Sequence, residues 1–551
     1  MNAGVLAFLA FTIPVLPLLG AAALQLAAMR EAALRISPWI PATALLLLPL
    51  YGNVVEFPWL LLGARVGLDE AALPLLLLAS IAWSVAGLHA RQHLEPERQD
   101  RFFLFWLLTW TGNLCVFITL DTASFYAAYA MMTFAAYGLV IFNGGSADFH
   151  AGRIYLVMAI LGEALILAAL LAIGSQLGNM ALGADQPGME QLSGHPWVLW
   201  CLLAGFGVKT GLLGLHMWLP LAHPRAPVPA SAVLSGVILK AGLMGWIRFL
   251  PLEQDGYGMA GMVLMIAGLA TAFFGVLAGL CQSRAKSLLA YSSVSQMGLI
   301  SVAIGLALQA PDRAPLLVIV AGIFALHHGL AKALLFLSVD IAARAPGSAR
   351  ALMWWPALAL AGAPATSGAL AKTALKSGAE TGPTGLETAL LISSITTTVL
   401  MARFLWLAWP REHGRLETTP TSLPWLFGVA AVMTVPWLLA SISDPESTLR
   451  PFRPTYLLDT TLPVLLGSFI ALLTGRLLSS RHLPRIPEGD ILALLPGGLP
   501  FKPPSLRPQS GKRPPARSTR ILEGIERTLG RPTPALIVLL GLLAAAFALL
   551  H

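Results

Sequence analysis

The sequence has few charged residues. Only 11% of its 551 residues are Asp, Glu, Lys or Arg, whereas soluble domains contain about 25%. In place of charge it has 56% hydrophobic residues and a mean hydropathy of +0.74. Apolar runs of roughly 17–25 residues, the length that a bilayer requires of a helix, recur along the chain. This pattern excludes an ordinary soluble protein and predicts a polytopic membrane protein.

The sequence is also poor in the residues that hold cofactors. Its three cysteines form no CxxC pair, which argues against an iron–sulfur cluster and a disulfide framework. There is no Gly-rich phosphate loop, no metal-ligand spacing and no nucleophile elbow. We therefore predict no catalytic, cofactor-binding or metal-binding residues, and no cofactor. Adjacent His327 and His328 would suggest a haem or copper site only with a facing histidine, for which His216 is a poor candidate.

The apolar runs predict an all-α fold of about 14–16 transmembrane helices. The stretch LLLGARVGLD (60–69) is predicted to be re-entrant or interfacial. The predicted spans are 4–28, 38–52, 70–91, 101–119, 123–143, 153–174, 197–218, 227–249, 258–280, 287–308, 314–339, 351–372, 386–408, 423–442, 459–479 and 534–550.

Arginine and lysine gather in the loops that follow the odd-numbered runs. The positive-inside rule places those loops in the cytoplasm and both termini outside. Residues 481–533, rich in proline and arginine (PFKPPSLRPQSGKRPPAR), are predicted to be cytoplasmic. They either lie on anionic headgroups or contact a neighbouring subunit. The net charge of +8 is thus explained by basic loops, and we predict no nucleic-acid partner.

Ionisable residues inside the apolar runs are the candidate functional residues. Each costs several kcal/mol at mid-membrane and indicates function by default. His216 lies seven residues after Lys209, and His328 and Lys332 are an i, i+4 pair. The alternatives are that His216 is a packing residue and that Lys372 extends to the interface. The full candidate set is Glu163, Lys209, His216, Lys240, His327, His328, Lys332 and Lys372.

Several blocks of the sequence are similar to one known family. They are KTGLLGLHMWLPLAHPRAPVPASAVLSGVILKAG (209–242), LLAYSSVSQMGLI (288–300), HHGLAKALLFL (327–337) and AGAPATSGALAK (361–372). They resemble the antiporter-like, proton-translocating subunits of respiratory complex I, membrane-bound hydrogenases and Mrp-type cation/proton antiporters. The similarity extends from about residue 70 to 410. It implies two inverted five-helix repeats, each with a broken helix, around a hydrated polar axis.

The resemblance also implies roles for five of these candidates. Lys209 matches the central lysine of the first half, and Lys240 the lysine of the following helix. Lys332 with His328 matches a connecting relay, and Lys372 the terminal lysine or glutamate of the second half. The implied organisation is N-terminal helices (1–100), a first half (101–249), a second half (250–408), C-terminal helices (409–480), the basic segment (481–533) and a final helix (534–551).

The sequence departs from the family at one position. The family places a glutamate, which pairs with the central lysine, where this chain has Ala130 in FYAAYAMMTFAAYGLV (125–140). Either Glu163 has taken over the pairing with Lys209, or the first half is not an independent pump. Leu213 also stands where the family often has proline at a helix break.

We therefore predict a proton-translocating subunit of a multisubunit energy-coupling complex in a bacterial cytoplasmic membrane, with other subunits and membrane lipids as partners. It would have no catalytic site of its own and could belong to a redox-driven oxidoreductase. The alternatives are a membrane subunit of an inorganic-carbon (CO2/bicarbonate) accumulation complex driven by a cation gradient, an Mrp-type Na⁺/H⁺ antiporter subunit and a non-pumping scaffold.

Overall fold

The computed structural model describes residues 2–178, 181–182, 196–344, 351–380, 382–409, 423–443 and 445–475. The predicted basic segment (481–533) and final helix (534–551) lie outside the described residues. The cytoplasmic placement of that segment and the external placement of both termini stay predictions.

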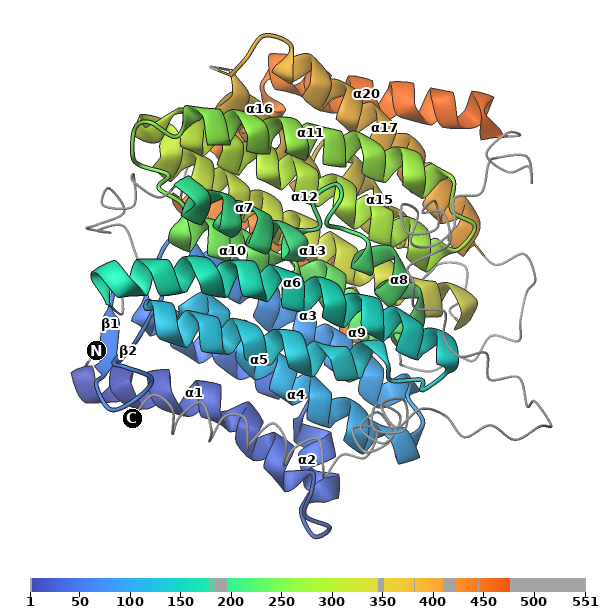
Figure 1. Ribbon diagram of the computed structural model, residues 1–551. Helices are drawn as coiled ribbons and strands as arrows, with labels where there is room; N and C mark the ends of the chain where they lie inside the picture. The colour runs from blue at the N-terminus through green and yellow to red at the C-terminus, as the bar shows by residue number, and fades with distance from the viewer. Residues whose placement is uncertain are drawn as a thin grey trace, which may run out of the picture.

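The described chain is a bundle of long helices that run roughly parallel or antiparallel to one another (Figure 1). Twelve helices are long and apolar enough to cross a membrane, or thirteen if the bent pair α2–η1 counts as one span. The helices are α1 (Ala3–Ala23), α2 (Arg30–Ile36), η1 (Ile40–Leu50), α3 (Ala72–His93), α4 (Pro96–Ile118), α5 (Thr122–Val140), α6 (Ser146–Leu177), α7 (Pro196–Thr210), α8 (Trp218–Arg225), α9 (Val228–Val233), η3 (Leu234–Ile238), α10 (Lys240–Phe249), α11 (Gly258–Leu280), α12 (Ala285–Gln309), η4 (Pro311–Arg313), α13 (Ala314–Arg344), α15 (Trp354–Ala361), α16 (Ser367–Ala379), α17 (Leu386–Ala408), α18 (Leu423–Ser443), α19 (Pro445–Leu449), η6 (Arg450–Phe452) and α20 (Pro454–Leu473). The prediction of an all-α polytopic membrane protein is confirmed.

Twelve of the predicted spans correspond to long helices, and the other four differ. The run 38–52 contains the 3₁₀ helix η1, bent by 56° from α2. The runs 197–218 and 351–372 are each broken into two short helices, and 534–550 lies outside the described residues. The stretch 60–69 forms part of an antiparallel hairpin of β1 (Val54–Phe57) and β2 (Ala64–Gly67), and its re-entrant or interfacial placement stays a prediction.

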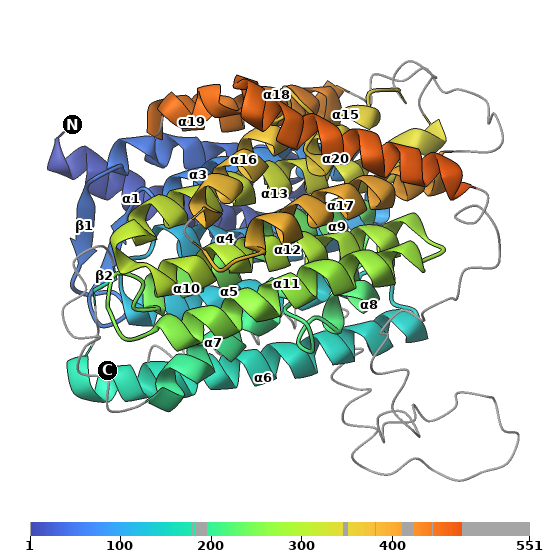
Figure 2. The ribbon, with the colours of Figure 1, turned by 90° about the horizontal axis from the view of Figure 1, so that it is seen from above.

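Helix α13 lies at the centre of the bundle. It packs against α3, α9, α12, α16 and α18, and Figure 2 shows it with α12 between the N-terminal and C-terminal helices. Helix α12 packs closely on α11 because glycines meet at their crossing. A Cβ added to Gly268 would stand 2.6 Å from the carbonyl oxygen of Gly298, and one added to Gly261 would stand 2.5 Å from that of Gly305. Such small residues bring membrane helices into backbone contact.

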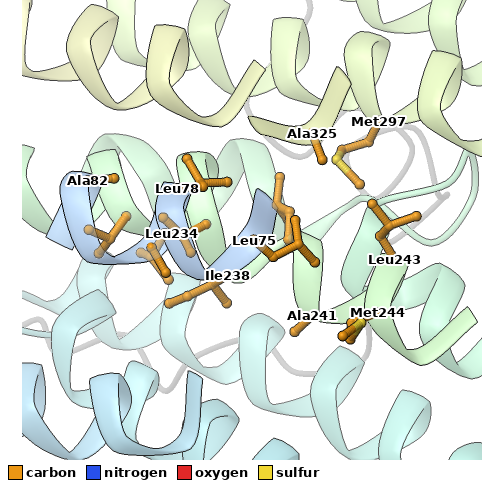
Figure 3. Close-up of a cluster of buried hydrophobic side chains, with 14 of the residues drawn as sticks. Leu75, Leu78, Ala82, Leu234, Ile238, Ala241, Leu243, Met244, Met297 and Ala325 are labelled. Carbon is orange, nitrogen blue, oxygen red and sulfur yellow. The ribbon is translucent and has the colours of Figure 1, made fainter. Parts of the chain in front are cut away.

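An apolar cluster fills the space between α3, η3, α10, α12 and α13 (Figure 3). Its side chains include Leu75 on α3, Ile238 on η3 and Met297 on α12, all at most 1% exposed. Lys240 lies between Ile238 and Ala241 in the sequence and is itself 0% exposed. Its ammonium group therefore sits in a segment that is otherwise apolar.

Candidate functional site

The first buried lysine lies where a membrane helix is interrupted. Helix α7 ends at Thr210, and α8 begins only at Trp218. Gly211 and Gly214 have φ angles of +80° and +85°, a conformation that favours glycine, so glycine makes the break that proline often makes in the family. Lys209 lies in the last turn of α7. The unpaired carbonyl groups at a helix C-terminus carry partial negative charge and favour a cation there.

Lys209 and Glu163 meet at a shared hydroxyl group. The Lys209 ammonium donates a hydrogen bond of 2.8 Å to Thr133 Oγ1 on α5. The Glu163 carboxylate, on α6, faces the same hydroxyl and the same ammonium. Both charged residues are 5% exposed. Among the described residues they form no ion pair within 4.0 Å, and Glu163 Oε1 is buried without a hydrogen-bond partner.

A small cavity separates the two charges. It is lined by both residues and by Tyr129, Tyr155 and Trp218, among others. The space open to the centre of a water molecule is about 10 Å³, close to the minimum of about 10–15 Å³ that one water needs. The Lys209 ammonium also lies 5.3 and 5.8 Å from the ring centroids of Tyr129 and Tyr155, within cation–π range.

Ala130 lies beside this cavity on α5. Tyr129 and Thr133, one residue before and three after it, provide the ring and the hydroxyl that reach Lys209. Sequence reasoning missed Thr133, because a threonine in an apolar run usually bonds only its own helix, as Thr133 does to the Tyr129 carbonyl. The sequence did contain one indication of its role, because Thr133 lies one turn after Ala130, the position of the family's lysine-pairing glutamate.

The second cluster joins Lys240 to Lys332 through two serines. Lys240 follows the π-helical segment η3, and its ammonium donates to the Ser235 carbonyl at 3.0 Å. The Ser235 hydroxyl contacts that of Ser293 on α12 at 2.5 Å. The Leu289 carbonyl accepts from both Ser293 (2.9 Å) and the Lys332 ammonium (3.0 Å). Neither serine was predicted from the sequence.

Two glycines bring these groups together. A Cβ added to Gly236 would stand 2.8 Å from the Gly329 carbonyl oxygen, and one added to Gly329 would stand 2.5 Å from that of Gly236. The segment η3 and helix α13 therefore cross at backbone contact. π-helical turns often occur at functional sites, and this one sets Lys240 beside the histidines and the lysine of α13.

His327 and His328 extend the cluster in different directions. His328 interacts electrostatically with Lys240 and Lys332, and neither of its buried ring nitrogens has a hydrogen-bond partner among the described residues. His327 Nδ1 lies 2.9 Å from the Ser367 hydroxyl at the start of α16. His327 also interacts with Lys372. The histidine that faces Lys372 is thus His327, and His328 faces the two central lysines.

The last buried lysine lies at a second helix break. Helix α15 ends at Ala361, and Gly362 follows with φ +87°. The Lys372 ammonium donates to the Ala361 carbonyl at 2.6 Å, so it again meets a helix C-terminus. Lys372 is partly exposed and lines a cavity between α16, α17 and α20, in which about 200 Å³ is open to the centres of water molecules.

His216 lies at the same helix break as Lys209. It is buried in the break between α7 and α8, with its ring 5.1 Å from that of Phe274 and 6.3 Å from that of Tyr291. Within the described part of the chain, no three His, Cys, Asp or Glu side chains are grouped to hold a metal ion.

Comparison with known proteins identifies the family. Residues 119–396, half of the chain, match the family described as NADH:quinone oxidoreductase/Mrp antiporter, TM. Hydrogenase-4 component B of Escherichia coli is 35% identical over 42% of this chain and 36% of its own length. NAD(P)H-quinone oxidoreductase chain 4 3 of Picosynechococcus is 33% identical over 43% and 44%. The matches therefore span less than half of these curated relatives.

Two solved structures share the fold. One is the membrane-bound sulfane sulfur reductase, an archaeal respiratory membrane complex, with a TM-score of 0.67, 21% identity and coverage of 86% of both chains. The other is the Mrp complex from Dietzia, with a TM-score of 0.67, 19% identity and coverage of 84% of this chain and 100% of that one. The likeness extends over most of the described bundle.

Proposed function

The chain belongs to the NADH:quinone oxidoreductase/Mrp antiporter family of membrane proteins, and we propose that it conducts protons across the membrane as one subunit of a larger complex. The observation that carries the proposal is the series of buried ionisable groups between the two helix breaks. Glu163 and Lys209 lie at the first break, Lys240 and Lys332 at the centre, and Lys372 at the second. Buried groups of this kind mark proton relays.

The relay works by passing charge between neighbours. An ammonium group stabilised by Glu163 at Lys209 becomes less stable when the two separate, and its proton then moves to the next basic group. His328 and His327, whose rings accept and donate protons, connect the central lysines to Lys372. Hydroxyls and single waters bridge the steps, since the side chains do not all touch.

We propose that the energy comes from partner subunits. The names of the relatives support such assemblies: a hydrogenase component, a quinone oxidoreductase chain, and respiratory and Mrp complexes. We propose a bacterial cytoplasmic membrane as its location. The presence of Glu163 favours a conducting subunit over a scaffold.

Lys372→Ala tests the function. The complex is purified through a tag on this chain and reconstituted in vesicles containing a fluorescent pH indicator. Transport is started with an electron donor, a sodium pulse or a bicarbonate pulse, and the effective drive identifies the kind of assembly. We expect Lys372→Ala to lower proton movement by orders of magnitude without loss of assembly.

Lys372→Glu is the matched control. Because the family also uses glutamate at this position, a titratable carboxylate should retain transport where alanine does not. Normal proton movement in Lys372→Ala would contradict the proposal. Failure of Lys372→Ala to assemble, with Lys372→Glu also inactive, would assign Lys372 to packing.

A further inference from the structure

The cavity beside Lys372 contains a cluster of charges that the relay does not use. Lys372 and Lys376 lie one turn apart on α16, and both line the cavity. The Lys376 ammonium donates to Asp459 Oδ2 on α20 at 2.6 Å and lies 3.6 Å from Glu387 Oε2 on α17. Three helices thus contribute one charge cluster, and Thr388 and Thr460 add hydroxyl groups to the lining.

The two lysines differ in their partners. Lys376 has two carboxylate partners, whereas Lys372 has, within the described part of the chain, the Ala361 carbonyl as its hydrogen-bond partner. Asp459 and Lys376 are each 28% exposed and Glu387 is 48% exposed. Of these three charged side chains, Glu387 is therefore the most exposed. At about 200 Å³ the cavity has room for several waters between them.

Helix α20 contacts the bundle at two levels, against α17 near its middle and against α16 nearer its start. A Cβ added to Gly467 would stand 2.7 Å from the Ile395 carbonyl oxygen on α17. Two turns earlier, Asp459 holds α20 against α16, and Tyr456 donates to Glu380 at 3.0 Å. Figure 1 shows α20 beside α17 at the edge of the bundle. Asp459 lies outside residues 119–396, which match the family.

We propose that Asp459, assisted by Glu387, is the proton acceptor through which Lys372 releases protons, and that Lys376 gates it. This inference rests on the proposed function. The Lys372 ammonium loses one proton through cavity water to the Asp459 carboxylate, leaving a neutral amine and a carboxylic acid. The neutral acid no longer forms an ion pair with Lys376, which then keeps Glu387 as its carboxylate partner. Loss of the proton to outside water restores the carboxylate and its pair with Lys376, which closes the route.

Asp459→Asn tests this step in the vesicles used for Lys372→Ala. We expect proton movement to fall by about a hundredfold, the lower range for loss of a positioned proton-transfer group. Asp459→Glu, which keeps a carboxylate, should transport. Tyr456→Phe, on the same end of α20, removes only a hydrogen bond outside the cavity and should behave as wild type.

A second variant separates proton transfer from docking. Lys376→Met combined with Asp459→Leu replaces the pair by apolar side chains, which folds tolerate well. If the pair only docks α20, this double variant should transport normally, and the proposal is overturned. If it assembles and does not transport, the proposal stands. An inactive Lys372→Ala with normal Asp459→Asn would reject the release step alone, whereas normal transport in both would reject the proposed function.

Discussion

The two helix breaks surround their buried lysines differently. Lys209 shares a hydroxyl and a cavity of about 10 Å³ with Glu163, a carboxylate from the neighbouring span. Lys372 meets a backbone carbonyl and opens into about 200 Å³, where the carboxylates belong to α17 and α20. The first break therefore has its charge and counter-charge around one small cavity. The second has its carboxylates on other helices that line a larger cavity.

Under the proposed function, the Glu163–Lys209 pair would hold a proton until a neighbour moves, whereas Lys372 would exchange its proton with cavity water. The central groups, Lys240 and Lys332, have carbonyl partners and, among the described residues, no carboxylate partner. An uncompensated buried charge is costly. The comparison predicts that the first break is most sensitive to loss of charge.

The largest effect is expected from Glu163→Gln. This change keeps the shape of the side chain and leaves Lys209 without its compensating charge, at a cost of about 3–5 kcal/mol if the lysine stays ionised. Proton movement in reconstituted vesicles should be abolished. Adding Ala130→Glu should partly restore it, because a carboxylate one turn before Thr133 supplies the family's usual partner.

Ala130→Gln in the Glu163→Gln background is the control for that rescue. Glutamine has the size of glutamate and no charge, so transport should stay absent. Equal rescue by both substitutions would mean that side-chain volume, not charge, matters at Ala130. Normal transport in Glu163→Gln alone would remove the pair from the relay and leave the second half as the conducting part.

The sequence indicates which lysines are buried in the helices, but it does not indicate which side chains surround them. Lys209 and Lys372 stand out because a charge in an apolar run is rare and expensive. Thr133 and Ser293 are ordinary residues for a membrane helix, and only the packing of separate helices makes them bridges. Asp459 lies at the beginning of a predicted span, 83 residues from its partner, so nothing local indicates the pairing.

The resemblance to the family predicted that two helices are broken, but the residue types alone did not show where each break lies. The sequence lacks proline at 213, and the interruption instead depends on glycines with positive φ on both sides of that position. A glycine in a membrane helix more often marks close packing, as Gly268 does on α11. Sequence alone does not distinguish these two uses, because they differ in backbone angle and not in residue type.

A moderate effect is expected at the junction between the halves. Ser235→Ala removes one hydroxyl of the 2.5 Å contact with Ser293. Loss of one hydrogen bond costs about 1 kcal/mol, which corresponds to about a fivefold slower proton movement if the contact carries the transfer. Ser301→Ala is the control, since Ser301 on α12 bonds only the Met297 carbonyl. If Ser235→Ala and Ser301→Ala move protons at the same rate, the Ser235–Ser293 contact carries no proton transfer between the two halves.

The smallest effect on transport is expected from Gly236→Ala. This change tests whether the short distance between η3 and α13 matters for proton movement. The new methyl group would lie 2.8 Å from the Gly329 carbonyl oxygen, so η3 and α13 must move apart by a few tenths of an ångström. Overpacking of this kind costs about 1–3 kcal/mol, and the melting temperature of the detergent-purified chain should fall. Proton movement should slow slightly, because Lys240 moves away from His328.

Gly174→Ala on α6 is the matched control. A Cβ there would meet no atom within 4 Å, and alanine favours a helix over glycine by about 0.5–1 kcal/mol, so its melting temperature should be equal or higher. Gly236→Ala with unchanged stability would mean that the crossing of η3 and α13 is compliant. In that case the π-helical turn before Lys240, rather than the glycine contact, would hold the central lysines together, and the two halves would be joined by a flexible link.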